Sequence, residues 1–213
     1  MSPAKQEILD SVRRALGPRA FDVESEYAAI ARAYRQEGKL ESECRLNLFA
    51  ERLRDYDAVM HRCFEENVAE KIAQILVDRN KRRLLVAGSV PASWRPEVFD
   101  LVEDQDLRYS AIDSSEGVLT MCAVAIAVTG TIVLRHSSNE GRRALSLIPD
   151  YHLCIVRASQ LVETVSEGIR RMRSFDRLPI TTISGPSATS DIEMTRIKGV
   201  HGPRTLEVIF VAD

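Results

Sequence analysis

The sequence predicts an α/β protein in which a mostly parallel sheet is flanked by helices and preceded by a helical N-terminal extension. After residue 57, short apolar runs alternate with helix-compatible segments, and this alternation implies crossover connections between parallel strands. Over the first 57 residues, apolar residues instead recur every three or four positions, as they do on one face of a helix. We therefore expect a helical extension over residues 1–57 and an α/β domain over residues 58–213.

The extension is expected to hold three helices. Ser2 can cap the first helix, which stops at Gly17; the second follows Asp22 and ends at Gly38, and the third follows Ser42. Each helix carries an apolar stripe, and packing of these stripes on the main domain is the default interpretation. The alternatives are packing on a second copy of the chain, which leaves a homo-oligomer open, and docking of the first helix on a partner. The stripe of the third helix consists of Leu46, Phe49, Leu53 and Tyr56.

Five apolar runs in the second part of the chain are predicted strands. The run that closes on Gly88 and Pro91 has the compact form of a buried parallel strand. Helices are expected between the first two runs and over about residues 159–174. The predicted strands are residues 58–64, 82–90, 152–158, 178–184 and 205–212.

Composition and charge exclude several classes of protein. The 213 residues are 45% hydrophobic and 28% charged, which is ordinary for a globular protein with a buried core. Lys and Arg number 29 against 31 Asp and Glu, so no strong field draws nucleic acid or an anionic membrane to the surface. The charged N-terminus is unlike a signal peptide, and no apolar run approaches the roughly 18 residues that span a bilayer. We expect a cytoplasmic protein that binds neither nucleic acid nor membrane.

The four cysteines are Cys44, Cys63, Cys122 and Cys154, and they are too widely spaced for a metal or cluster motif. Iron–sulfur and zinc sites favour clustered thiolates, and a disulfide framework needs a secreted context. Three of the cysteines, all except Cys44, lie in apolar runs and are expected to be small buried side chains. We therefore expect no metal or cofactor bound by this chain.

The stretch SGPSATSDIE, directly after the apolar run that ends at Ile183, is the strongest candidate for a ligand site. In an open α/β sheet, ligands collect beyond the carboxyl ends of strands, where loops expose backbone N–H groups. Glycine allows close approach of the backbone, and the hydroxyl groups can bind a phosphate or carboxylate. A plain turn rich in Gly, Pro and Ser fits the composition equally well. The candidate ligand-binding residues here are Ser184, Gly185, Pro186, Ser187, Thr189, Asp191 and Glu193.

Three further stretches are weaker candidates. Thr129, Gly130 and Thr131 join two apolar segments, which suits a hairpin that fills the core and also leaves room for a ligand. In NEGRRALSLIP, Arg142 at the start of a short helix could grip an anion, although an arginine pair is more often a solvated face. In GVHGPRTLEV, His201 and Gly202 could serve acid–base chemistry or simply form a turn. No nucleophile, base and orienting acid occur at motif spacing, so no catalytic residue is assigned.

These stretches occur in the same order in the LUD-domain family, which the chain resembles, and in particular in its lactate utilization protein C (LutC) type. The resemblance covers roughly residues 117–212, where the pair SGPSATSDIE and GVHGPRTL is its most specific part. Upstream, only the pattern of helices and strands supports it. The resemblance favours the anion-binding loop over the plain turn.

The resemblance implies a fold akin to the superfamily of ribose-5-phosphate isomerase (RpiA), glucosamine-phosphate deaminase (NagB) and the CoA-transferases. It also implies a non-redox subunit of a system that oxidises L-lactate to pyruvate and binds a small anionic metabolite. Iron–sulfur clusters would then lie on partner proteins (LutA/LutB-like). The alternatives are a free-standing enzyme or binding protein for a phosphosugar, CoA ester or folate-like ligand, and a structural module without a ligand.

The chain departs from the family at two positions near the TGT turn. Relatives commonly carry an acid where this sequence has Val128, and many carry Asp where it has Ala123. If those carboxylates serve chemistry in relatives, this chain lacks that chemistry or uses Asp191 and Glu193 instead. The resemblance therefore does not establish whether this chain is an enzyme by itself.

Overall fold

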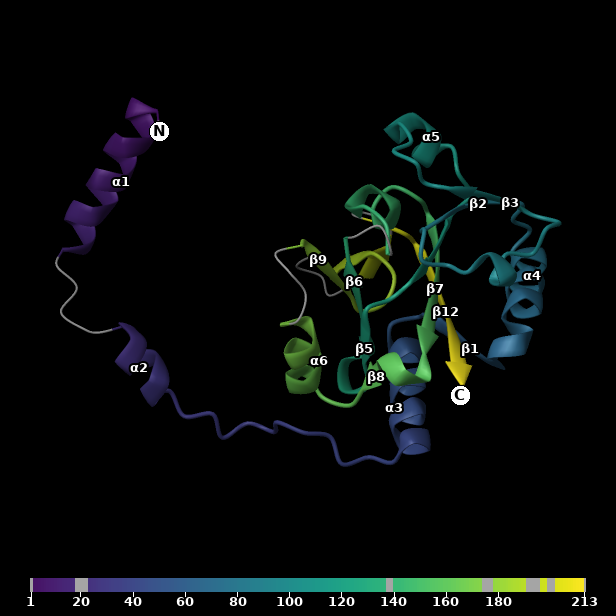
Figure 1. Cartoon of the computed structure of the whole chain (residues 1–213), viewed down its shortest axis with the longest axis horizontal. Coiled ribbons are helices and arrows are strands. Elements are labelled where there is room, and N and C mark those ends of the chain that lie inside the picture. Colours follow the sequence, from purple (N-terminus) through teal and green to yellow (C-terminus); the bar gives the residue numbers. More distant parts are fainter. Residues whose placement is uncertain are drawn as a thin grey trace. The chain divides into compact units, whose positions relative to one another are not determined.

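The computed structural model describes residues 2–17, 23–136, 140–173, 178–190, 196–198 and 202–212 (Figure 1). It divides into two compact units, residues 1–34 and 35–213. The first unit holds α1 (Pro3–Leu16) and α2 (Val23–Ala29). The third predicted helix belongs to the second unit, so this division falls earlier in the chain than the expected boundary at residue 57.

Helix α1 forms as its sequence predicts. The hydroxyl of Ser2 accepts a hydrogen bond from the backbone N–H of Lys5, and Gly17 ends the helix with a φ of +66°. Its apolar stripe is exposed, with Ile8 at 65% and Leu16 at 71% of their full accessible area. What this stripe packs on stays a prediction.

The second predicted helix is shorter than expected, because α2 ends at Ala29 and not at Gly38. Residues 31–41 are not helical. Within the second unit, the carbonyl oxygens of Arg35 and Gln36 accept hydrogen bonds from the hydroxyl of Ser166 at 2.8 Å and from Nη2 of Arg170 at 3.0 Å. The buried carboxylate of Glu163 accepts hydrogen bonds from the backbone N–H groups of Lys39 and Leu40, both at 2.6 Å. Tertiary contacts thus override the helical pattern of this segment.

A six-stranded sheet forms the centre of the second unit. Its strand order is β1-β12-β7-β4-β2-β3, and every neighbouring pair is parallel. Four of the five predicted strands lie in it, which confirms the predicted mostly parallel α/β fold. The strands are β1 (Val59–Phe64), β2 (Arg83–Val86), β3 (Asp100–Glu103), β4 (Val118–Met121), β7 (Tyr151–Arg157) and β12 (Thr205–Ala212).

A smaller sheet packs on the first, with the strand order β8-β5-β6-β9. The hairpin predicted around the TGT turn is confirmed: β5 and β6 are antiparallel, and Gly130 has a φ of +59°. The fifth predicted strand is corrected, because β9 is an antiparallel edge strand of this sheet and not a strand of the parallel sheet. Its exposure alternates along the strand, as expected when only one face is covered. The strands are β5 (Val124–Ile126), β6 (Thr131–Arg135), β8 (Leu161–Val162) and β9 (Ile180–Ile183).

Helices complete the layers of the second unit. Helix α4 (Val68–Asp78) packs on one face of the large sheet, and α3 (Ser42–Asp55) packs with the small sheet on the other face. Helix α6 (Val165–Met172) covers β5 and β8 and is shorter than predicted, because β8 occupies the start of that segment. Leu46, Phe49 and Leu53 of α3 are buried, which confirms the packing expected for this helix. The remaining elements are η1 (Glu65–Asn67), η2 (Ala92–Trp94), α5 (Tyr109–Asp113), η3 (Ala127–Thr129), η4 (Arg143–Ser146), η5 (Ala158–Gln160), β10 (Ala188–Ser190) and β11 (Arg196–Lys198).

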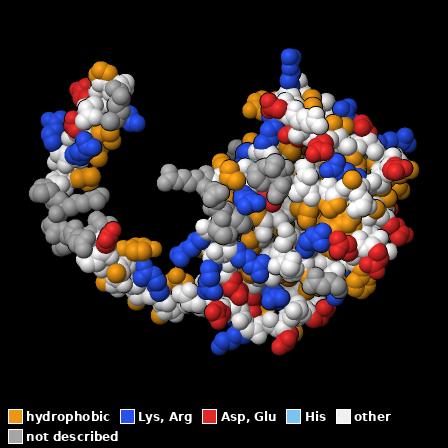
Figure 2. All heavy atoms as spheres, in the orientation of Figure 1, with side chains coloured by type: hydrophobic (Ala, Val, Ile, Leu, Met, Phe, Trp, Pro, Cys, Tyr) orange, Lys and Arg blue, Asp and Glu red, His pale blue; other side chains and the backbone are white. Residues whose placement is uncertain are grey.

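Side-chain exposure agrees with two expectations from composition. Cys63, Cys122 and Cys154 are buried and Cys44 is exposed, all four as free thiols. On the face of the second unit in view in Figure 2, acidic and basic side chains are interspersed. Within the described segments, every helix is too short or too polar to cross a lipid bilayer.

A buried carboxylate ties β12 to its neighbours. Glu207 accepts a hydrogen bond from His61 Nε2 at 2.7 Å and pairs with the guanidinium of Arg79. Burial alone would raise the pKa of Glu207, but the hydrogen bonds from His61 and Arg79 outweigh burial and hold this pKa below its usual value. Ionised Glu207 therefore stabilises the folded state.

We expect this contribution to depend on pH in a defined direction. It is fully present above about pH 4.5, the ordinary pKa of a Glu side chain, and is lost as the pH falls through the lower folded-state pKa. Urea unfolding of the wild type and Glu207→Gln checks this. The difference between their free energies of unfolding should shrink as the pH falls below about 4.5. A difference that does not change with pH would contradict the ion pairs.

Candidate functional site

The SGPS loop lines a cavity of about 240 Å³, here called the loop cavity. Residues 184–187 form one wall and residues 202–203 form another. His152 and Leu206, near the amino ends of β7 and β12, also line it. The expected placement beyond the carboxyl end of a parallel strand is therefore wrong, because β9 runs in the small sheet. The loop nevertheless faces a cavity, as a ligand loop must.

Gly185 shapes the loop through its packing. It has a φ of +86°, in the left-handed region that favours glycine, and a Cβ at this position would lie under 3.0 Å from the Cβ of Tyr56. Tyr56 follows α3, so the loop is pressed against the end of that helix. Gly185 therefore serves the fold directly, whatever it does for a ligand.

The two most specific sequence motifs meet at this cavity. The backbone N–H of Ser187 donates to the carbonyl oxygen of Pro203 at 2.8 Å. A Cβ on Gly202 would lie 3.5 Å from the Cβ of Ser187, so the two backbones pass close together. Segments that are more than a dozen residues apart in the sequence thus form one rim.

The TGT turn supports the loop from behind and does not line the cavity. The hydroxyls of Thr129 and Thr131 are 2.7 Å apart, and the hydroxyl of Thr131 is 2.7 Å from that of Ser184. Gly130 packs against the backbone of Arg52 in α3, where a Cβ would lie 3.0 Å from its carbonyl carbon. This chain of hydroxyl groups fixes the start of the SGPS loop.

The cation at the cavity is Arg143 and not the predicted Arg142. Arg142 forms a two-point ion pair with Asp104, through Nε at 2.7 Å and Nη2 at 3.0 Å, and so anchors a neighbouring loop. Arg143 is exposed, lines the cavity, and donates through Nη1 to the hydroxyl of Ser146 at 3.0 Å. The side chains of adjacent residues in a 3₁₀ turn are separated by about 120° around the helix axis. Only one of the two neighbouring arginines therefore faces the cavity.

His152 forms part of the cavity lining and was missed by the sequence analysis. It is 1% exposed, and its Nε2 lies 2.8 Å from the hydroxyl of Thr120. The sequence did contain a signal for it, because a histidine in an otherwise apolar strand is unusual. A buried imidazole needs a polar partner, so such a histidine indicates a polar group nearby.

The polar chain continues inward from His152 to two buried thiols. The hydroxyl of Thr120 also contacts the sulfur of Cys154 at 3.6 Å. Burial would raise the pKa of the Cys154 thiol, but hydrogen bonds from Cys122, His152 and Thr120 lower it below its usual value. The thiol is fully buried, so this polarisation does not make it accessible to a ligand.

Several predicted site residues cannot be placed by geometry. Asp191, Glu193 and His201 lie outside the described residues, and Thr189 is described only as backbone in β10. These assignments stay predictions. Among the described residues, no three His, Cys, Asp or Glu side chains gather as a metal site requires.

The fold and this cavity define a class of α/β protein in which a small, largely antiparallel sheet packs on a parallel sheet, with a hydroxyl-lined loop at their junction. The chain belongs to the LUD domain family, whose model matches residues 46–211. The match begins within α3, in agreement with the packing of that helix in the second unit.

Named relatives and a solved structure agree with this assignment. Lactate utilization protein C of Deinococcus radiodurans is 41% identical over 211 residues, which cover 98% of this chain and 95% of that protein. Lactate utilization protein C of Halalkalibacterium halodurans is 38% identical over 123 residues, 55% of this chain and 53% of that protein. The crystal structure of a DUF162 family protein from Deinococcus radiodurans matches with a TM-score of 0.71 and 40% identity, over 81% of this chain and 99% of that one.

Proposed function

We propose that this protein takes part in lactate utilization as a subunit that binds a small carboxylate in the loop cavity. The observation that carries the proposal is that the exposed Arg143 lines the same cavity as Ser184 and Ser187. An arginine fork binds a carboxylate through two parallel hydrogen bonds, and hydroxyl groups can bind the remaining oxygen atoms of a hydroxy acid. The names of the relatives supply the metabolic context.

The size of the cavity supports a small ligand. Pockets for drug-sized ligands are typically about 300–1,000 Å³, and the loop cavity is about 240 Å³. L-Lactate and pyruvate are anions of this smaller class. A CoA ester or a folate-like ligand would extend far outside the cavity, so we favour the small carboxylate over those alternatives.

The redox step is assigned to partners in this proposal. The cysteines of this chain are Cys44, Cys63, Cys122 and Cys154, of which the last three are buried. Cys122 and Cys154 contact each other, and Cys63 lies in a different core cluster. Oxidation of L-lactate to pyruvate releases two electrons and two protons, which iron–sulfur partner proteins would accept. This chain would then hold the carboxylate, while the partners carry the electrons.

Arg143→Gln tests ligand binding directly. We expect it to weaken binding of L-lactate or pyruvate about tenfold or more, because it removes a charge-assisted hydrogen bond worth about 1.5–3 kcal/mol. Thermal stability should barely change, because Arg143 is exposed. Isothermal titration calorimetry with each acid measures the effect.

The matched control is Arg82→Gln, which removes an exposed arginine outside the cavity. It should leave carboxylate affinity unchanged. Equal affinities in the wild type and Arg143→Gln, or no binding of either acid by the wild type, would contradict the ligand site. The partner assignment is tested separately, since purification from lactate-grown cells should recover iron–sulfur proteins with this chain.

A further inference from the structure

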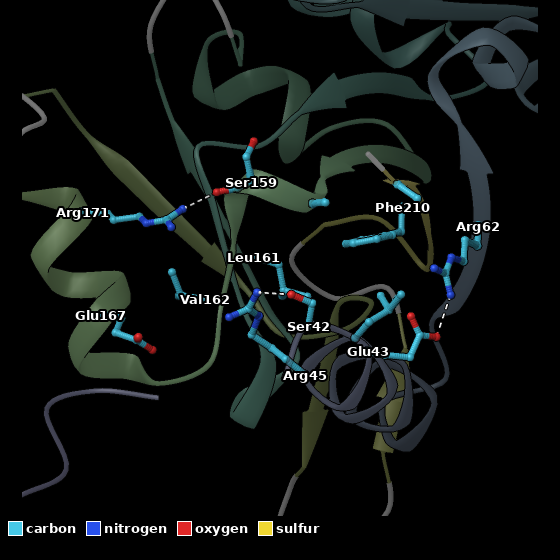
Figure 3. Close-up of a pocket in the computed structure, with 13 residues that line it drawn as sticks. Ser42, Glu43, Arg45, Arg62, Ser159, Leu161, Val162, Glu167, Arg171 and Phe210 are labelled. Carbon is cyan, nitrogen blue, oxygen red and sulfur yellow. Dashed lines mark hydrogen bonds and ion pairs between the residues drawn. The ribbon is translucent and has the colours of Figure 1, made fainter. Parts of the chain in front are cut away.

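A second cavity lies beyond the carboxyl ends of β7 and β12, at the opposite end of these strands from the loop cavity. Figure 3 shows residues that line it. Its volume is about 410 Å³. The first turn of α3, the residues after β7, strand β8 and helix α6 surround it. In open parallel sheets ligands collect beyond the carboxyl ends of strands, so this is where the fold itself favours a ligand. We call it the arginine cavity.

Three arginines from three different elements line the arginine cavity, namely Arg45 of α3, Arg62 of β1 and Arg171 of α6. Arg62 is paired with Glu43, through Nη1 and Oε1 at 2.7 Å. Arg171 donates through Nη1 to the carbonyl oxygen of Ser159 at 2.6 Å, a contact that holds its guanidinium at the cavity wall (Figure 3).

Glu167 is the second acidic residue that lines the arginine cavity, and its carboxylate is already hydrogen-bonded at the start of α6. Glu167 accepts from the backbone N–H of Thr164 at 2.8 Å and closes the capping box of α6. Burial raises the pKa of Glu167, but backbone hydrogen bonds outweigh burial and lower it, so this carboxylate is ionised and held in place.

Arg45 is the arginine whose contacts are incomplete. Its Nη2 reaches the hydroxyl of Ser42 only at 3.5 Å, the outer limit of a hydrogen bond. Its Nε is buried and has no acceptor in the part of the chain that the structure describes. An unsatisfied buried N–H is costly, and such groups are rare unless something else satisfies them. A rotation of the guanidinium toward an anion in the cavity would satisfy it.

The floor of the arginine cavity is apolar. Leu46, Leu161 and Phe210 are at most 4% exposed and contribute to the core between the two sheets. Val162 is also buried and extends the same wall. The lining therefore suits a ligand with a charged end and a short apolar part.

We propose that the arginine cavity binds an organic phosphate. Arg45, Arg171 and the hydroxyls of Ser42 and Ser159 contact the phosphate group, and the organic part lies on the apolar floor. The donors come from several elements around the cavity. A tetrahedral phosphate accepts hydrogen bonds from several directions at once, whereas a carboxylate accepts them in one plane. The site is separate from the loop cavity and independent of the proposed function, because lactate carries no phosphate.

The probe for this site is phenyl phosphate, which combines a phosphate with a small apolar group. We expect calorimetry to detect binding by the wild-type protein, and Arg45→Gln and Arg171→Gln each to weaken it about tenfold or more. Phenol, which lacks the phosphate, and inorganic phosphate, which lacks the ring, should both bind more weakly than phenyl phosphate. Arg143→Gln should keep the wild-type affinity for phenyl phosphate, since it alters only the loop cavity.

Three outcomes would overturn the proposal. The first is the absence of phenyl phosphate binding by the wild type. The second is unchanged affinity in both cavity variants. The third is that Arg143→Gln lowers the affinity for phenyl phosphate as much as Arg45→Gln does, which would place the phosphate in the loop cavity. Thermal melting without ligand identifies any variant that fails to fold, and Arg171→Gln then stands in for Arg45→Gln. Lactate affinity in the same variants separates the two proposals.

Discussion

Gly185→Val is expected to destabilise the folded protein by about 3 kcal/mol or more, through overpacking and backbone strain together. A Cβ at this position would lie under 3.0 Å from the Cβ of Tyr56, and the φ of +86° is unfavourable for a β-branched residue. Urea unfolding measures the loss. Carboxylate binding should fall as well, since Ser184 and Ser187 flank the displaced residue.

A double-mutant cycle separates the contact with Tyr56 from the strain of the backbone. Gly185→Ala should lower the free energy of unfolding more in the wild-type protein than in the Tyr56→Gly variant. The reason is that Tyr56→Gly removes the side-chain atoms that collide with the new Cβ. The loss of stability that remains in Tyr56→Gly reports the strain of the positive φ together with the close approach of the new Cβ to the carbonyl oxygen of residue 56, at 3.2 Å. If Gly185→Val weakens binding while the free energy of unfolding stays unchanged, the glycine serves ligand approach and not the fold.

Glu163→Ala is expected to cost about 2–3 kcal/mol of folding stability. Its carboxylate is 1% exposed, pairs with Arg35, and accepts the backbone N–H groups of Lys39 and Leu40. Removal of the carboxylate leaves these donors without their acceptor and opens a void beneath Gly38, whose backbone packs on the Glu163 side chain. The segment of residues 35–40 should detach before the rest of the unit unfolds.

Limited digestion with trypsin reads out this local effect, because the segment contains Arg35 and Lys39. We expect faster cleavage there in Glu163→Ala, together with a lower urea midpoint. Glu37→Ala is the matched control. Glu37 lies in the same segment, its side chain is 79% exposed, and it meets Arg170 only at 3.9 Å, so its loss should cost less than about 0.5 kcal/mol. Equal effects of the two substitutions would show that Glu163 does not anchor the segment.

Several elements could be predicted from local pattern alone. The apolar run in residues 205–212 gives β12, which is buried over six of its eight residues. Leu46, Phe49 and Leu53 of the α3 stripe are buried as expected, and the TGT turn is a hairpin with a left-handed glycine. In each of these cases the local signal and the tertiary environment favour the same conformation.

Other elements depended on partners that the sequence does not reveal. The run in residues 180–183 has the composition of a parallel strand but pairs antiparallel with β6. Around residues 35–40, contacts with Glu163, which lies more than 120 residues away, replace part of the predicted helical pattern. Arg143 and His152 reach the loop cavity only because η4 and β7 lie beside the SGPS loop.

The sequence by itself determined the fold class, the buried cysteines, the left-handed glycine of the hairpin, and the two motifs that form the rim of the loop cavity. Only the tertiary structure decided which sheet β9 joins, which of two adjacent arginines lines the loop cavity, and that a second cavity lies at the far end of β7 and β12. The physical reason is that periodicity reports which side of a segment is buried, whereas the identity of its neighbour depends on packing between segments distant in the chain.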